Sequence, residues 1–196
     1  MDETFDALVG RALAGEGGAL PRLIEHCLPG LRAWIRLQTG EALRAKESAS
    51  DLAQSVCLEL LQDLSSFEYR GEAAFRQWLY RAAERKIRDR ARYWQAERRD
   101  VAREQRPRAE DERADELLDC YATFCTPSRV AVAREELARI ETAFAALSPE
   151  HREVILLARM LGLPHAEIAQ RMHRSEGAVR VLLFRALAEL AEELGE

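Results

Sequence analysis

Residues 148–187 contain three short segments with apolar side chains at helical spacing, and this pattern leaves few folds open to the chain. Gly162-Leu163-Pro164 separates the first two segments, and residues 172–177 separate the last two. Short helices that meet at sharp turns predict a helix-turn-helix, a unit that commonly binds DNA. An ordinary helical hairpin is the alternative for this stretch taken alone.

The last of these segments has the features of a helix that enters a DNA groove. Ser175 is expected to cap it, and Glu176 follows in the first turn, where a negative charge suits the helix dipole. Residues near a helix N-terminus reach base edges, and arginines hold phosphates. The expected buried stripe is Val179, Leu182, Leu183, Ala186 and Leu190; the residues left to face a groove are Arg174, Ser175, Glu176, Gly177, Arg180 and Arg185.

The charge of the chain is unevenly distributed. The net charge of −5 at pH 7 argues against a nucleic-acid partner, but ten basic and only four acidic residues lie between Arg70 and Arg99. A basic island in an otherwise acidic chain is typical of a surface that binds phosphates. A solvated helix face is the alternative, and such faces usually carry both signs of charge.

The whole chain has the periodicity of helices, and we expect an all-α fold of two small helical domains joined by a linker, the second a helix-turn-helix. Ser50 and Asp51 are expected to open one helix, and Pro29-Gly30 to interrupt an earlier one over 20–37. The aromatic stretch 65–72 has no helical period and is expected to form a loop before a long basic helix. The expected boundaries are a first domain over 1–99, an acidic linker with a short helix over 100–129, and a second domain over 130–196.

Motifs for catalysis are missing from the sequence. It has no glycine-rich phosphate loop, no HExxH and no GxSxG, so we expect no enzyme and no cofactor. The four cysteines, Cys27, Cys57, Cys120 and Cys125, lack CxxC spacing, so we expect reduced thiols and no metal site. No apolar run is long enough for a membrane span, and the acidic N-terminus lacks a signal-peptide pattern, so we expect a cytoplasmic protein.

Two regions of the sequence together resemble the extracytoplasmic-function (ECF) sigma factors of bacterial RNA polymerase. The stretch "SASDLAQSVCLELLQDLSSFEYRGEAAFRQWLYRAAERKIRDRAR" is similar to sigma region 2, and "SPEHREVILLARMLGLPHAEIAQRMHRSEGAVRVLLFRAL" is similar to region 4. Each motif is moderately specific, whereas both in this order, with this separation, are strong. The resemblance implies a transcription initiation factor whose partners are core RNA polymerase and promoter DNA.

The resemblance also implies roles for individual residues. The helix over 51–63 would dock on the polymerase, and its polar candidates are Asp51, Gln54 and Glu59. The loop would capture a flipped base of the minus-ten element by stacking and edge hydrogen bonds, and the basic helix would hold the separated strands. The minus-ten candidates are Phe67, Tyr69, Arg70, Arg76, Arg81, Arg85, Lys86, Arg88 and Arg92. Phe67 is equally suited to be a core anchor. The groove-facing residues near Arg180 would bind the minus-thirty-five element.

The second domain departs from the family pattern. After Arg180 the sequence continues "VLLF", where the family commonly has further basic or polar residues, and residues 137–196 carry a net charge of −2. Upstream binding is then weak, or Val181 and Phe184 form an apolar patch for a partner such as an anti-sigma factor. Two alternatives follow: a helix-turn-helix regulator that works without core polymerase, and a sigma-like decoy that binds an anti-sigma factor.

Overall fold

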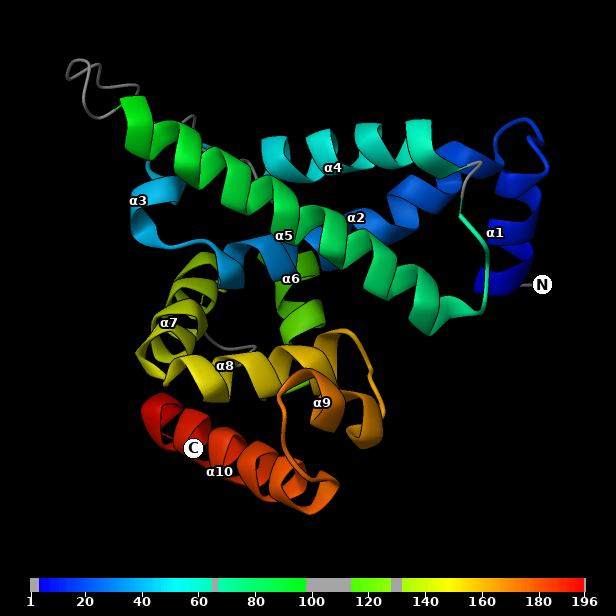
Figure 1. Cartoon of the computed structure of the whole chain (residues 1–196). Helices are drawn as coiled ribbons and strands as arrows, with labels where there is room; N and C mark the ends of the chain where they lie inside the picture. The colour runs from blue at the N-terminus through cyan, green and yellow to red at the C-terminus, as the bar shows by residue number, and fades with distance from the viewer. Residues whose placement is uncertain (1–3, 65–66, 98–113, 128–131, 196) are drawn as a thin grey trace. The chain divides into compact units, whose positions relative to one another are not determined.

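The protein folds into two compact helical units, Met1–Glu112 and Arg113–Glu196. The structure, a computed structural model, describes residues 4–64, 67–97, 114–127 and 132–195, and this described part of the chain contains no strand (Figure 1). The predicted all-α class with two helical domains is therefore confirmed. Ser65, Ser66 and the first part of the expected linker lie outside the described residues.

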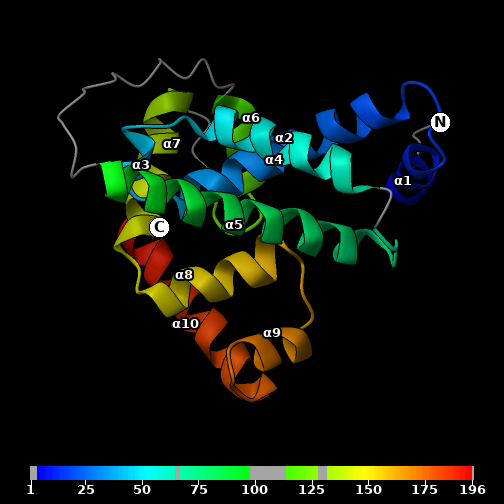
Figure 2. The same cartoon turned by 45° about the horizontal axis from the view of Figure 1, so that its top comes forward.

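The first unit is built around the long helix α2. Its helices are α1 (Phe5–Leu13), α2 (Ala19–Gln38), α3 (Glu41–Arg44), α4 (Ala49–Asp63) and α5 (Glu72–Glu97). Helices α1, α4 and α5 all pack on α2, with α4 alongside it in Figure 2 and α5 crossing it in Figure 1. The buried core of this unit includes Leu31, Trp34, Ile35, Leu52, Val56 and Leu79.

Helix α2 differs from the prediction because it continues through Pro29 and Gly30 without the expected interruption. A proline inside a helix removes one backbone hydrogen bond. Here Leu31, Trp34 and Ile35 are fully buried just beyond it, and burial of large side chains outweighs that loss. Gly30 has its own function in packing, because a Cβ at this position would lie 3.2 Å from the hydroxyl of Tyr80 on α5.

The start of α4 also differs from the prediction. Its N-cap is Ser48, whose hydroxyl accepts a hydrogen bond from the backbone N–H of Asp51 at 2.9 Å. The expected cap, Ser50, lies within the first turn of the helix. Asp51 therefore occupies the third helical position, where its carboxylate is close to the positive end of the helix dipole.

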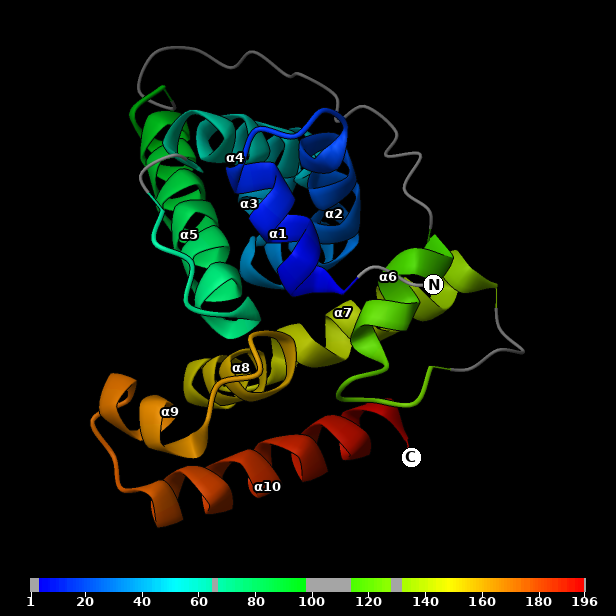
Figure 3. The same cartoon turned by 90° about the vertical axis from the view of Figure 1, so that its right-hand side faces the viewer.

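The second unit contains the predicted helix-turn-helix. Its elements are α6 (Ala114–Tyr121), α7 (Ala133–Ala146), α8 (Pro149–Ile155), the π-helical turn η2 (Leu156–Met160), α9 (His165–Arg171) and α10 (Glu176–Leu194). Figure 3 shows α10 alongside α8, and both α8 and α9 contact it. Four residues of the expected α10 stripe are buried, whereas Leu182 is only half-buried.

Helix α6 lies within the range expected to be a linker, but it packs on α7 as part of the second unit. Its residues Leu117, Leu118 and Tyr121 share one face and are buried. The hydroxyl of Tyr121 lies 3.0 Å from a carboxylate oxygen of Glu141 on α7, and the rings of Phe124 and Phe144 lie 5.8 Å apart. These apolar contacts explain why a segment in an acidic stretch folds onto the domain that follows it.

Candidate nucleic-acid interface

The outer face of α4 is polar with one large apolar side chain at its centre. The three residues predicted for this surface, Asp51, Gln54 and Glu59, are all exposed. Glu59 lies toward α5, where its carboxylate pairs with the ammonium of Lys86 at 2.5 Å. Sequence reasoning missed Leu58, which is 62% exposed. Its position off the apolar stripe of the helix was the signal that it points outward.

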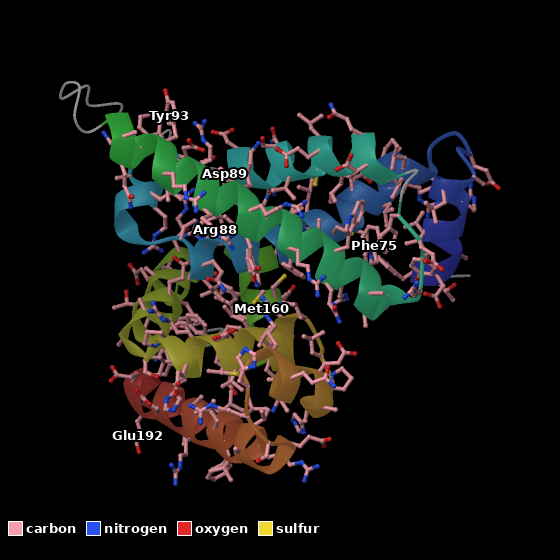
Figure 4. All side chains as sticks on the ribbon, in the orientation of Figure 1. Phe75, Arg88, Asp89, Tyr93, Met160 and Glu192 are labelled. Carbon is pink, nitrogen blue, oxygen red and sulfur yellow. The ribbon has the colours of Figure 1, made fainter. Side chains whose placement is uncertain are left out.

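The loop between α4 and α5 is anchored by a cluster of aromatic rings. The ring of Phe67 stacks on Trp78 with centroids 4.5 Å apart, and it meets the edge of Phe75 at 5.7 Å. Phe75 is buried, while Phe67 and Trp78 are half-buried. Figure 4 shows Phe75 in the first turns of α5. Phe67 is thus fixed by its neighbours, which favours its role as an anchor of the loop.

The side chains that follow Phe67 point away from this cluster or contact another helix. The hydroxyl of Tyr69 donates a hydrogen bond to Asp6 on α1. Glu68 and Arg70 are both exposed and form an ion pair at 2.7 Å. Gly71 has a φ of +98°, a backbone conformation that side chains rarely adopt, and it turns the chain into α5.

The exposed face of α5 carries a continuous row of arginines. Arg81, Arg85, Arg88 and Arg92 are spaced by three or four residues, so they lie on one side of the helix, and all four are exposed. The opposite side buries Leu79, Ala82 and Ala83 among others. Of the other predicted cations, Arg76 pairs with Glu72 at 2.5 Å and Lys86 pairs with Glu59. We call the row of four the arginine stripe.

Two aromatic residues at the end of α5 were missed by the sequence reasoning. Glu47 accepts a hydrogen bond from the indole nitrogen of Trp94 at 2.7 Å, and it also binds Arg90. The Arg90 guanidinium lies over the ring of Tyr93 at 4.9 Å. Tyr93 is 49% exposed and points away from the ribbon in Figure 4. The available signal was an aromatic pair within a basic run, a combination typical of nucleic-acid surfaces.

In the second unit, the start of α10 holds the residues predicted to face a groove. Ser175 caps the helix, as predicted, by accepting a hydrogen bond from the N–H of Ala178 at 3.2 Å. Gly177, Arg180 and Arg185 are exposed, as are Arg174, Ser175 and Glu176. The Nη2 of Arg174 donates to both carboxylate oxygens of Glu150 on α8, each at 2.8 Å. Arg180 lies 3.5 Å from Glu176.

An apolar patch lies on α10 beside these polar residues. Val181 is 51% exposed and Phe184 is 74% exposed. They are three residues apart and therefore share a face of the helix, between Arg180 and Arg185. We call these two residues the apolar patch; they are the large apolar side chains that α10 exposes.

The cysteines of the first unit face an apolar hollow lined by α2, α4 and α5. Cys27 and Cys57 lie in its wall with Leu60, Leu61 and Trp78. Burial raises the pKa of Cys27 to about 12 and that of Cys57 to about 11, so both thiols hold their protons at neutral pH. Among the residues that the structure describes, no group of three His, Cys, Asp or Glu side chains is placed to hold a metal ion. No helix in the described ranges is long and apolar enough to cross a membrane.

Comparison with known proteins assigns each unit to a family. Residues 23–99 match the model described as Sigma-70 region 2, and residues 137–190 match Sigma-70, region 4. The chain is similar to the ECF RNA polymerase sigma factor SigD of Mycobacterium tuberculosis, with 31% identity over 98% of this chain and 84% of that protein. It is also similar to the ECF sigma factor ShbA of Streptomyces griseus, with 31% identity over 96% of this chain and 95% of the relative.

Among solved structures, the fold is similar to that of CnrH in its complex with the cytosolic domain of CnrY. The TM-score is 0.55 at 24% identity, and the match covers 96% of this chain and 95% of the other. At this identity the likeness concerns the fold.

Proposed function

The chain belongs to the ECF group of the sigma-70 family, and from this premise we propose which of its surfaces bind polymerase and promoter DNA. As a member of this family it is a transcription initiation factor without catalytic activity, and it directs core RNA polymerase to promoters. The proposed site of action is the cytoplasm. The arginine stripe on α5 is the observation that carries the proposed roles of individual residues.

We propose that core polymerase binds the outer face of α4. Asp51 and Gln54 supply polar contacts, and Leu58 supplies an apolar contact in the middle of the same face. Glu59 contributes mainly by holding Lys86, because its carboxylate is already engaged with that ammonium. Interfaces of this kind gain most from a desolvated apolar centre with a polar rim, which matches this arrangement.

The minus-ten element is proposed to bind the loop and the arginine stripe. Phe67 holds the loop on Trp78, and Tyr69 and Arg70 present a hydroxyl and a guanidinium to an unpaired base. From Arg81 to Arg92 the stripe extends about 16 Å along α5, or roughly five base steps of one strand. Tyr93, which follows the stripe, offers a stacking surface to a base. Melting would draw its free energy from tighter binding of the unpaired strand than of the duplex.

The minus-thirty-five element is proposed to bind the N-terminal half of α10. Arg174, Arg180 and Arg185 reach phosphates or base edges, while Glu176 and Gly177 lie nearest the groove floor. Ser175 serves this surface indirectly, because its hydroxyl is committed to the cap. A second proposed role, supported by the exposure of Val181 and Phe184, is a protein partner such as an anti-sigma factor on the same helix.

Run-off transcription with core polymerase tests this proposal. Templates would first be selected from a randomised promoter library, and wild type would be compared with Arg70→Ala and with a variant in which all four stripe arginines are alanine. Both variants are expected to lose specific starts while still binding core. Arg22→Ala, an exposed arginine on α2, is the matched control and is expected to transcribe normally.

The outcomes separate the proposal from its alternatives. If wild type binds core but starts no transcript on any template, the decoy that binds an anti-sigma factor is favoured. If wild type binds duplex DNA alone and ignores core, the helix-turn-helix regulator is favoured. If the stripe variant transcribes like wild type, the proposed strand path on α5 is wrong.

A further inference from the structure

Asp6 on helix α1 is hydrogen-bonded to Tyr69 in the loop between α4 and α5, the loop proposed to capture a base. Asp6 accepts the hydrogen bond donated by Tyr69, 63 residues away in sequence. The helix that carries Asp6 is itself fixed, because Leu8 and Val9 are buried and the ring of Phe5 meets Phe75 at 5.6 Å. Both ends of this hydrogen bond are therefore attached to the same aromatic cluster.

The partner of a hydroxyl determines what else that hydroxyl can bind. A phenol has one proton to donate and two lone pairs that accept, whereas a carboxylate accepts only. With its proton directed at Asp6, the Tyr69 oxygen keeps only its accepting lone pairs for another ligand. Partial burial and the bond to Asp6 raise the pKa of Tyr69 above its ordinary value, so the hydroxyl keeps its proton at neutral pH.

We infer that Asp6 is a specificity-determining residue that acts through Tyr69, and that it selects an unpaired base with an exocyclic amino group. The accepting oxygen of Tyr69 receives a hydrogen bond from such an amino group. A carbonyl oxygen at the same place on the base meets the lone pairs of Tyr69 and is repelled. This inference rests on the proposed function, because it assumes that the loop captures a base.

The surroundings of the hydroxyl support this assignment. Asp6 is exposed and Tyr69 is half-buried, so their hydrogen bond lies at the surface of the first unit, where a ligand has access. Its neighbours in the chain, Glu68 and Arg70, are exposed and pair with each other at 2.7 Å, so neither is bonded to the Tyr69 hydroxyl. A bound base excludes water from the Tyr69 oxygen. The repulsion between that oxygen and a carbonyl oxygen of the base is then stronger than it would be in water.

Binding of forked promoter DNA to the full holoenzyme tests the inference. Library selection with wild type and with Tyr69→Phe first identifies the minus-ten position whose base preference depends on the hydroxyl. At that position an amino group is then exchanged for a carbonyl on the same ring, as cytosine for uracil or adenine for hypoxanthine. Wild type is expected to lose about tenfold in affinity, the effect of replacing one hydrogen bond by a repulsive contact.

Asp6→Ala is expected to reduce this discrimination to about twofold or less, because the freed hydroxyl can turn and donate to a carbonyl oxygen. Asp6→Asn, whose amide oxygen still accepts, is expected to retain part of it. Glu16→Gln removes an acidic charge elsewhere in the first unit and is expected to discriminate like wild type. Thermal unfolding of each variant separates a loss of specificity from a loss of fold.

Three results would overturn the inference. Unchanged discrimination in Asp6→Ala would mean that Asp6 does not set the preference, while the proposed function would stand. An unchanged base preference in Tyr69→Phe at every position would remove the base contact itself, again without touching promoter-directed transcription. A wild-type protein that starts no transcript would overturn the proposed function and this inference together.

Discussion

The ring of Phe67 and the indole of Trp78 lie stacked, with their planes inclined by 21° and their centroids 4.5 Å apart. This contact attaches the loop before α5 to the second turn of that helix. Because Phe67 is half-buried in the aromatic cluster, we expect its removal to lower the stability of the first unit as well as to affect DNA binding.

We expect Phe67→Ala to lower the free energy of unfolding by about 2 kcal/mol, below the cost at a fully buried position. Arg70→Ala, three residues further along the chain in an exposed ion pair, is expected to unfold like wild type. Chemical denaturation followed by circular dichroism measures both. Equal stability of the two variants would show that the ring of Phe67 does not anchor the loop.

Leu58 gives a test of the polymerase-binding face. Leu58→Ala is expected to weaken binding to core polymerase by about five- to tenfold, because an exposed leucine that becomes buried at an interface contributes about 1–1.5 kcal/mol. Leu13→Ala on α1 is the matched control, since Leu13 is also exposed but lies on another helix. Both variants should unfold like wild type. If both bind core with wild-type affinity, the contact surface is elsewhere.

Arg174, which we propose to bind upstream DNA, forms an ion pair with Glu150 in the free protein. Glu150→Gln is expected to raise affinity for a minus-thirty-five duplex by about three- to fivefold, because Arg174 no longer leaves a carboxylate in order to bind a phosphate. Glu153→Gln removes an exposed charge from the same helix without releasing this pair. Titration at constant salt compares the two. Equal gains in affinity for the two variants would show that overall charge causes the effect. No gain in affinity for Glu150→Gln would show that Arg174 does not contact the DNA.

The thiols of Cys27 and Cys57 predict a loss of stability at alkaline pH. Their pKa values are raised in the folded protein from 9.0 to about 12 and about 11, so unfolding releases protons once the pH exceeds about 9. The stabilisation is complete below pH 9 and is lost as the pH rises through the folded-state values, with a slope of at most about 1.4 kcal/mol per pH unit for each thiol. Denaturation between pH 8 and 11 measures it. The Cys27→Ala, Cys57→Ala variant should show a shallower loss, and the same slope as wild type would contradict the assignment.

Much of the fold followed from the spacing of apolar residues, while the exceptions depend on tertiary contacts. On α10 the spacing correctly predicted a buried face that includes Val179 and Leu190, because apolar residues that recur about every 3.6 positions lie on one side of a helix. At Pro29 the local rule predicted a break, but the burial of Trp34 on the continuing helix outweighed it. Sequence spacing describes one element at a time and cannot weigh contacts that later elements supply.

The candidate site was predictable to the extent that exposure follows from periodicity. The arginine stripe lies on one side of α5 because its spacing is helical, and the sequence shows that directly. The burial of Phe67 depends on its contact with Trp78 in the next helix, and the hydrogen bond between Asp6 and Tyr69 joins two segments 63 residues apart in the sequence. Contacts between distant segments leave no local pattern, so no reading of the loop alone would have found Asp6.

Phe184 provides the test that separates DNA from protein as the partner of the apolar patch. Phe184→Ala removes the largest exposed ring of α10 and should leave the fold intact, since the side chain is 74% exposed. If the patch meets thymine methyl groups in the major groove, the variant loses about tenfold in affinity for its upstream element, and core binding is unchanged.

Selection on a promoter library with Phe184→Ala and with Val181→Ser distinguishes the two partners. A DNA role predicts weaker preference for thymine at one or two upstream positions, together with reduced run-off transcription. A protein role predicts wild-type promoter selection by both variants and loss of binding to the anti-sigma partner. Ala188→Ser, an exposed position one turn beyond Phe184, should behave like wild type in both assays. Wild-type behaviour of all three variants would show that the patch binds neither partner.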